Sequence, residues 1–84
     1  MFAIVGRWRV DEALTPEQLV HIADTVWQQP GFSRGYWGQE TDDDTYAHAV
    51  VILDDEASAR MMAEGVRSAI PSAELRVLHV LADA

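Results

Sequence analysis

The sequence contains no cysteine, no lysine and no long apolar run, and each absence excludes a class of protein. Without cysteine, the chain can form neither a disulfide framework nor a thiolate metal site. Its six basic residues are all arginines, set against 14 acidic residues, and the formal net charge is −8. That balance argues against nucleic acid as a partner, because phosphate binding needs a basic surface. No stretch approaches the about 20 apolar residues of a membrane span, and no basic amphipathic face is present, so we expect no membrane contact.

The remaining composition describes a small globular chain. Its first seven residues, MFAIVGR, lack the charged start and cleavage pattern of a signal peptide, so we expect a cytoplasmic location. Residues 1–84 are expected to form a single domain with a marginal core, which a structural metal or self-association could reinforce. The three histidines are far apart and show no short metal-binding spacing, so we predict no metal site.

The most informative segment is Thr45–Asp54, which predicts a strand in the middle of a sheet. A half-exposed antiparallel strand alternates apolar and polar residues, and this segment barely does. Both of its faces must therefore be covered. The two faces would carry Tyr46, His48, Val50 and Ile52 on one side and Ala47, Ala49, Val51 and Leu53 on the other.

The other segments complete a familiar order of elements. Apolar periodicity and capping residues predict strands at 2–10, 32–41 and 74–81 and helices at 15–29 and 56–70, with a polar hairpin turn at 41–45. This order predicts an α+β, ferredoxin-like βαββαβ fold. Its four-stranded antiparallel sheet has the first and third strands in the centre and both helices on one face. The opposite face would be bare although it is partly apolar, so we expect a homodimer that closes through that face into an α/β barrel.

Three short motifs, in the context of this order, resemble the antibiotic-biosynthesis-monooxygenase-like branch of the dimeric α/β-barrel superfamily. They are IVGRWRV at 4–10, QPGF at 29–32 and VILDDEA at 51–57. The resemblance covers nearly the whole chain. The superfamily that the chain resembles includes cofactor-independent oxygenases, haem-degrading enzymes, isomerases, small decarboxylating or cyclising enzymes and members with no known reaction. The resemblance implies a ligand pocket between the sheet and the helices. Haem-degrading relatives carry an asparagine where this chain has Gly6, and they and many oxygenase relatives carry a tryptophan where it has Leu53. We therefore do not expect haem degradation.

Small residues and aromatic rings suggest the place of that pocket. By the resemblance, one face of the central strands carries small side chains that leave space for an aromatic small-molecule ligand. The predicted substrate-binding residues are Gly6, Trp8, Trp37, Ala47, Ala49 and Leu53, with Tyr36 also near. The alternative is that Trp8 and Trp27 simply fill the space that the small residues leave.

Three residues are candidates for catalysis: His79, Tyr36 and Arg34. An imidazole suits proton transfer near neutral pH, and a guanidinium can bind a carboxylate through two hydrogen bonds. Arg34 and Arg7 could equally pair with the many acidic residues. His48 is expected at the dimer contact, and His21 is expected in solvent.

The sequence leaves two functions open. The first is a small cofactor-independent monooxygenase that acts on an aromatic or polyketide-like compound. The second is a non-catalytic module of the same fold that binds a metabolite or associates with other proteins, since polar groups are scarce on both faces of the sheet.

Overall fold

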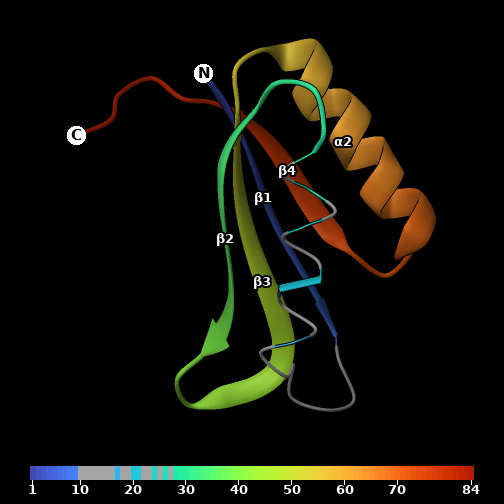
Figure 1. Ribbon diagram of the computed structural model, residues 1–84. Helices are drawn as coiled ribbons and strands as arrows, with labels where there is room; N and C mark the ends of the chain where they lie inside the picture. Colours follow the sequence, from blue (N-terminus) through green and yellow to red (C-terminus); the bar gives the residue numbers. More distant parts are fainter. Residues whose placement is uncertain (10–16, 18–19, 22–23, 25, 27) are drawn as a thin grey trace.

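The computed structural model describes residues 1–9, 17, 20, 21, 24, 26 and 28–84. Four strands form one antiparallel sheet in the order β2-β3-β1-β4, so the predicted central pair, β1 and β3, is confirmed (Figure 1). The strands are β1 (Phe2–Arg9), β2 (Phe32–Glu40), β3 (Asp43–Leu53) and β4 (Glu74–His79), and the helix α2 (Glu56–Ala69) lies along one side of them. In the described part of the chain, no helix is long and apolar enough to cross a membrane.

The predicted helix at 15–29 falls largely outside the described residues. Those of its residues that are described with helical backbone are Glu17, Val20, His21, Asp24 and Val26. Val26 packs against the same core cluster as α2, which places it on the same side of the sheet. The chain therefore has the predicted ferredoxin-like α+β fold.

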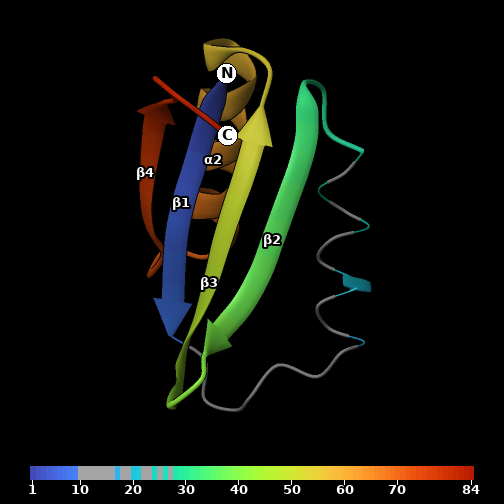
Figure 2. The same cartoon turned by 90° about the vertical axis from the view of Figure 1, so that its left-hand side faces the viewer.

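The register of the sheet separates its two faces. Val51 and Val77 flank Ile4, whereas Val50 and Arg76 flank Val5 in the next row. Cross-strand partners project to the same side, so successive rows alternate between the faces. We call the side under α2 the helix face and the opposite side the open face, which lies toward the viewer in Figure 2. The open face carries Ala3, Val5, Arg7, Arg9, Arg34, Tyr36, Tyr46, His48, Val50, Ile52, Glu74, Arg76 and Leu78.

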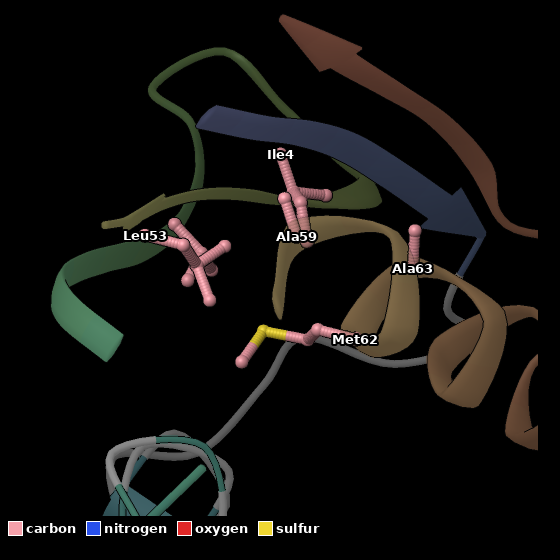
Figure 3. Packing of buried hydrophobic residues seen from close by; sticks show 6 residues of the cluster. Ile4, Leu53, Ala59, Met62 and Ala63 are labelled. Atoms are coloured by element: carbon pink, nitrogen blue, oxygen red, sulfur yellow. The ribbon is translucent and has the colours of Figure 1, made fainter. Parts of the chain in front are cut away.

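The core lies between the helix face and α2. Leu53 and Ala59 are fully buried, and Ala63 is 1% exposed, so small helix residues let α2 approach the sheet closely. Figure 3 shows Ile4 and Leu53 pointing toward α2, where Ala59, Met62 and Ala63 meet them. The apolar periodicity of residues 56–70 had predicted this helix stripe correctly.

Capping fixes where α2 begins. The Asp55 side chain accepts a hydrogen bond from the Ser58 backbone N–H at 2.8 Å, which satisfies one of the donors that a helix start leaves free. Gly31 packs against Ser58 at the same place. Only glycine suits this position, because its φ of +77° is one that other residues rarely adopt and because Ser58 leaves no room for a Cβ. The junction of 31 with 55–58 therefore ties the start of β2 to the start of α2.

The second and third strands end one residue earlier than predicted, at Glu40 and Leu53, and two further boundaries differ by two residues. The third strand begins at Asp43 rather than Thr45, because Glu40 pairs with Asp43 and leaves only Thr41 and Asp42 for the turn. The last strand ends at His79 rather than Leu81. Its partner β1 begins at Phe2, opposite His79, and a single backbone hydrogen bond, from the Val80 N–H to the Met1 carbonyl at 3.0 Å, continues the contact beyond that pair.

Candidate functional site

All six predicted substrate-binding residues lie on the helix face. Gly6 is opposite Ala49, and Trp8 is opposite Ala47 on the two central strands. Trp37 of the edge strand is also opposite Ala49, and Leu53 is the centre of the core. The register therefore brings these residues to one side of the sheet, where their role in binding a ligand stays a prediction.

Leu75 of β4, rather than open space, covers Gly6. A Cβ added at position 6 would overlap Leu75 Cδ2, so the absence of a side chain there is what lets the leucine lie across β1. Ala47 is 1% exposed, which leaves no room for a water molecule beside it. Gly6 is thus packed under Leu75, and Ala47 and Ala49 are buried. Trp27, which the alternative prediction placed in this space together with Trp8, lies outside the described residues.

Trp37 is held close to its own strand. A Cβ added at Gly35 would lie 2.5 Å from Trp37 Cη2, so the indole ring lies over the backbone of Gly35. The ring packs against the core cluster and is half-buried. Gly35 therefore permits this close approach, as a glycine within a strand often does.

An apolar groove of about 320 Å³ runs beside α2 on the helix side of the molecule. Its size falls at the lower end of the range of small-molecule sites, about 300–1,000 Å³. Its walls are almost entirely apolar, and a Cβ added at Gly65 would meet no atom within 4 Å. The lining residues are Val26, Gln29, Met61, Met62, Gly65, Val66, Ala69 and Ile70.

His79 lies at the end of the helix face, next to Phe2. The two rings stack with centroids 4.9 Å apart and planes inclined by 15°. Phe2 packs against the core cluster, so the imidazole rests on an anchored aromatic platform while staying exposed to solvent. This arrangement fixes the ring plane of an ionisable group whose type suits proton transfer near neutral pH.

The other two catalytic candidates are not brought to His79. Arg34 is opposite Ile52 and Tyr36 is opposite Val50, so both project from the open face, on the far side of the sheet. Tyr36 is 60% exposed there. A β-bulge lies between Phe32 and Arg34 and shifts the register of β2 by one residue. As a result, Phe32 is on the helix face whereas Arg34 and Tyr36 are on the open face.

A row of ionisable side chains crosses the open face, and we call Glu40, His48, Arg7 and Glu74 the polar row. Arg7 Nε donates to Glu74 Oε2 at 2.6 Å, and this hydrogen bond raises the pKa of the Arg7 guanidinium. Arg7 Cζ also lies 4.6 Å from the centre of the Tyr46 ring. His48 Nε2 lies 3.8 Å from Glu40 Oε1 at the other end of the row.

Sequence reasoning missed this row as a unit. Arg7 and His48 were considered singly, and Glu74 was not considered at all. The signal was the alternation of Glu74 and Arg76 with Leu75 and Val77, which marks a strand with one charged face. A hollow of about 580 Å³ lies over this part of the open face, lined by Val5, Gly6, Arg7, His48, Glu74, Leu75 and Arg76.

Comparison with known proteins supports the fold. No protein-family model and no curated protein match the sequence. SnoaB, a cofactor-independent oxygenase from Streptomyces nogalater, has a similar structure in two crystal structures, one of them of a mutant, each with a TM-score of 0.69. In both, 98% of this chain aligns with 94% of SnoaB at 19% identity. A Deinococcus radiodurans protein assigned as an antibiotic biosynthesis monooxygenase aligns with 100% of this chain over 95% of its own length, at 14% identity and a TM-score of 0.62. The chain therefore shares its ferredoxin-like α+β fold with SnoaB and with the Deinococcus radiodurans protein.

Proposed function

We propose that the protein is a small homodimeric, cofactor-independent monooxygenase that acts on an aromatic or polyketide-like compound. The observation that carries this proposal is the likeness in fold to SnoaB over 98% of the chain. The groove beside α2 supports an apolar substrate, since its walls offer few polar groups. The His79 imidazole supports a role in proton transfer, because it is exposed and held in one plane by Phe2.

The chemistry needs a base but no external reductant. An aromatic methylene group that loses a proton becomes an electron-rich carbanion, which can itself supply electrons to O₂. One oxygen atom then becomes the carbonyl of the product and the other leaves as water, so that CH₂ and O₂ give C=O and H₂O. In this proposal His79 accepts the proton as the general base. His79 does not line the groove, so the proposal requires a substrate that extends from the groove to the imidazole beside Phe2.

Tyr36 and Arg34 take a different place in this proposal. They lie on the open face, which the second copy of the chain would cover, so we assign them to the dimer contact rather than to the base. Open-face apolar side chains support such a contact: Val5, Val50 and Leu78 are 38%, 37% and 46% exposed in the single chain. An apolar sheet face of this kind commonly marks an association surface.

Oxygen uptake tests the enzymatic proposal. A panel of aromatic quinols and aromatic methylene compounds should include at least one that the protein oxidises. His79→Gln should then lower kcat about 10²–10⁴-fold, as expected for the loss of a general base. His21→Gln, an exchange of the same type outside the site, should leave kcat unchanged. Uptake that continues at the full rate in His79→Gln would remove His79 from the reaction.

A second variant separates binding from chemistry. Gly65→Leu places a side chain into the groove, where a Cβ at position 65 meets nothing within 4 Å. If the substrate binds in the groove, KM should rise at least roughly tenfold while kcat changes little, since the variant removes binding that ground state and transition state share. An unchanged KM would exclude the groove as the substrate site.

A non-catalytic binding module is the second candidate, and one observation favours it. Leu75 covers Gly6, and Ala47 has no accessible space beside it, so the centre of the helix face holds a packed layer. Under this alternative, an aromatic compound would raise the unfolding temperature without any oxygen uptake. The same panel therefore distinguishes the two functions.

A further inference from the structure

The open face carries most of the positive charge of an acidic chain. Four of the six arginines project from it, while the other two belong to α2. The four are Arg7, Arg9, Arg34 and Arg76. With a net charge of −8, two copies of the chain repel each other at a distance, and this repulsion is weakest where arginines offset the carboxylates. The open face is such a surface.

The polar row joins residues of all four strands. Gly38 holds the register position opposite His48, and Glu40, at the end of β2, reaches His48 only through its side chain. Glu40, His48, Arg7 and Glu74 come from β2, β3, β1 and β4 respectively, and Arg7 is directly opposite both His48 and Glu74 in the register. Each carboxylate has a basic neighbour in its own chain, at 2.6 Å for Glu74 and 3.8 Å for Glu40. Covering the row therefore buries the charges of Arg7 and Glu74 as a pair, which costs far less than burying either charge alone.

The apolar part of the open face is too small to hold a dimer alone. Strands lie about 4.8 Å apart and rows of one face about 6.7 Å apart, so the two rows through Ala3 and Val5 cover roughly 260 Å². Part of this area belongs to Arg34 and Arg76, which lie in the same two rows. A stable interface buries roughly 800 Å² on each partner. A second copy that covers Val5 and Val50 must therefore also cover Arg7 and His48 in the next row.

We propose that the partner copy covers the polar row, and that the charges of Arg7 and Glu74 help to select a second copy of this chain as the partner. This inference rests on the homodimer of the proposed function and adds to it the residues that discriminate between partners. In this dimer the exposed apolar side chains of the open face, Val5, Val50 and Leu78, supply most of the attraction between the two copies. The polar row allows the contact to form only with a partner whose charges balance those of Arg7 and Glu74, because like charges brought together at an interface are strongly unfavourable.

Charge-reversed variants test whether Arg7 and Glu74 determine which chains pair with each other. Arg7→Glu gives a chain of net charge −10 with three carboxylates in its row, and Glu74→Arg gives one of net charge −6 with two arginines. Each variant should dimerise at least roughly tenfold more weakly with itself than the wild type does. When the two are co-expressed with different tags, native mass spectrometry should find roughly nine tenths of all dimers to be heterodimers, instead of the half that random pairing gives.

An ion pair on α2 supplies the matched control. Arg60 and Glu56 pair at 2.9 Å in one chain, away from the open face, and their reversals give the same two net charges. Arg60→Glu with Glu56→Arg should pair randomly. Sorting in this control to the same extent would assign the effect to overall charge and overturn the proposal, as would random pairing of the Arg7 and Glu74 variants. A wild-type monomer would instead refute the dimer itself.

Carboxylate labelling tests the same contact in the unaltered protein. The Glu74 side chain is 65% exposed in the single chain and the Glu56 side chain 53%, so a carbodiimide reaches both. On raising the concentration from monomer to dimer, labelling of Glu74 should fall at least about threefold and labelling of Glu56 should stay constant. Equal labelling of Glu74 in both states would contradict the proposal even if the variants failed to fold.

Discussion

Gly6→Ala is the substitution that most directly tests how the helix face is filled. The new methyl group would overlap Leu75 Cδ2, so the leucine tip has to retreat by roughly 1 Å or more to restore a normal contact of about 3.5 Å between carbon atoms. Overpacking of this kind costs about 1–3 kcal/mol. Alanine in a strand recovers about 0.5–1 kcal/mol relative to glycine. We therefore expect a net loss of about 1 kcal/mol, or about 4–8 °C in Tm for a domain of this size.

The reason for that loss is tested by adding Leu75→Ala. Leu75 is half-buried, so its own truncation should cost about 1–2 kcal/mol, less than the about 2–5 kcal/mol of a fully buried leucine. In the double variant the methyl group at position 6 meets no leucine. Urea unfolding at one fixed chain concentration should then show the double variant to be at least about 1 kcal/mol more stable than the sum of the two single losses predicts. If the two single losses in unfolding free energy add to that of the double variant within about 0.5 kcal/mol, Gly6 does not provide the space that Leu75 occupies.

Three further substitutions test the core, the helix start and the hairpin. Leu53→Ala removes a fully buried side chain and should lower the free energy of unfolding by about 2–5 kcal/mol, whereas Leu53→Met should cost under about 1.5 kcal/mol; equal losses would contradict the packing. Asp55→Ala removes the cap and should cost about 0.5–2 kcal/mol, with Asp54→Ala as the control that changes stability little. The hydrogen bond from Thr45 lowers the pKa of Asp43, so its stabilisation is present above the ordinary value of 3.8 and is lost as the pH falls through the lowered value. The difference in Tm between wild type and Asp43→Ala should therefore shrink toward zero in strong acid, and a constant difference would contradict it.

The sequence predicted the fold well because its signals are local and repeated. Both faces of residues 45–54 are largely apolar, which predicted a sheet covered on both sides. The apolar spacing of residues 56–70 predicted α2 correctly. Strand ends were less accurate, since they depend on how far the neighbouring strand extends, as at His79 and Phe2.

The site was harder to predict because side-chain packing across strands leaves no local signal. Nothing near Gly6 in the sequence indicates that Leu75, some 70 positions later, lies over it. The β-bulge near Arg34 likewise decides which face Arg34 and Tyr36 occupy, and a bulge changes that face by a single residue. The separation of these two residues from His79 follows from the register of the sheet.

In the proposed dimer the open face carries the contact between the two copies and the helix face carries the ligand, and sedimentation equilibrium at micromolar concentration can test this division. The chain has a mass of 9.4 kDa, so a dimer has twice that, 18.8 kDa. This division predicts 18.8 kDa for the wild type and for Met61→Arg on α2, and 9.4 kDa for Val50→Arg at the centre of the open face. A monomeric wild type, or a Val50→Arg variant that remains a dimer, would contradict it.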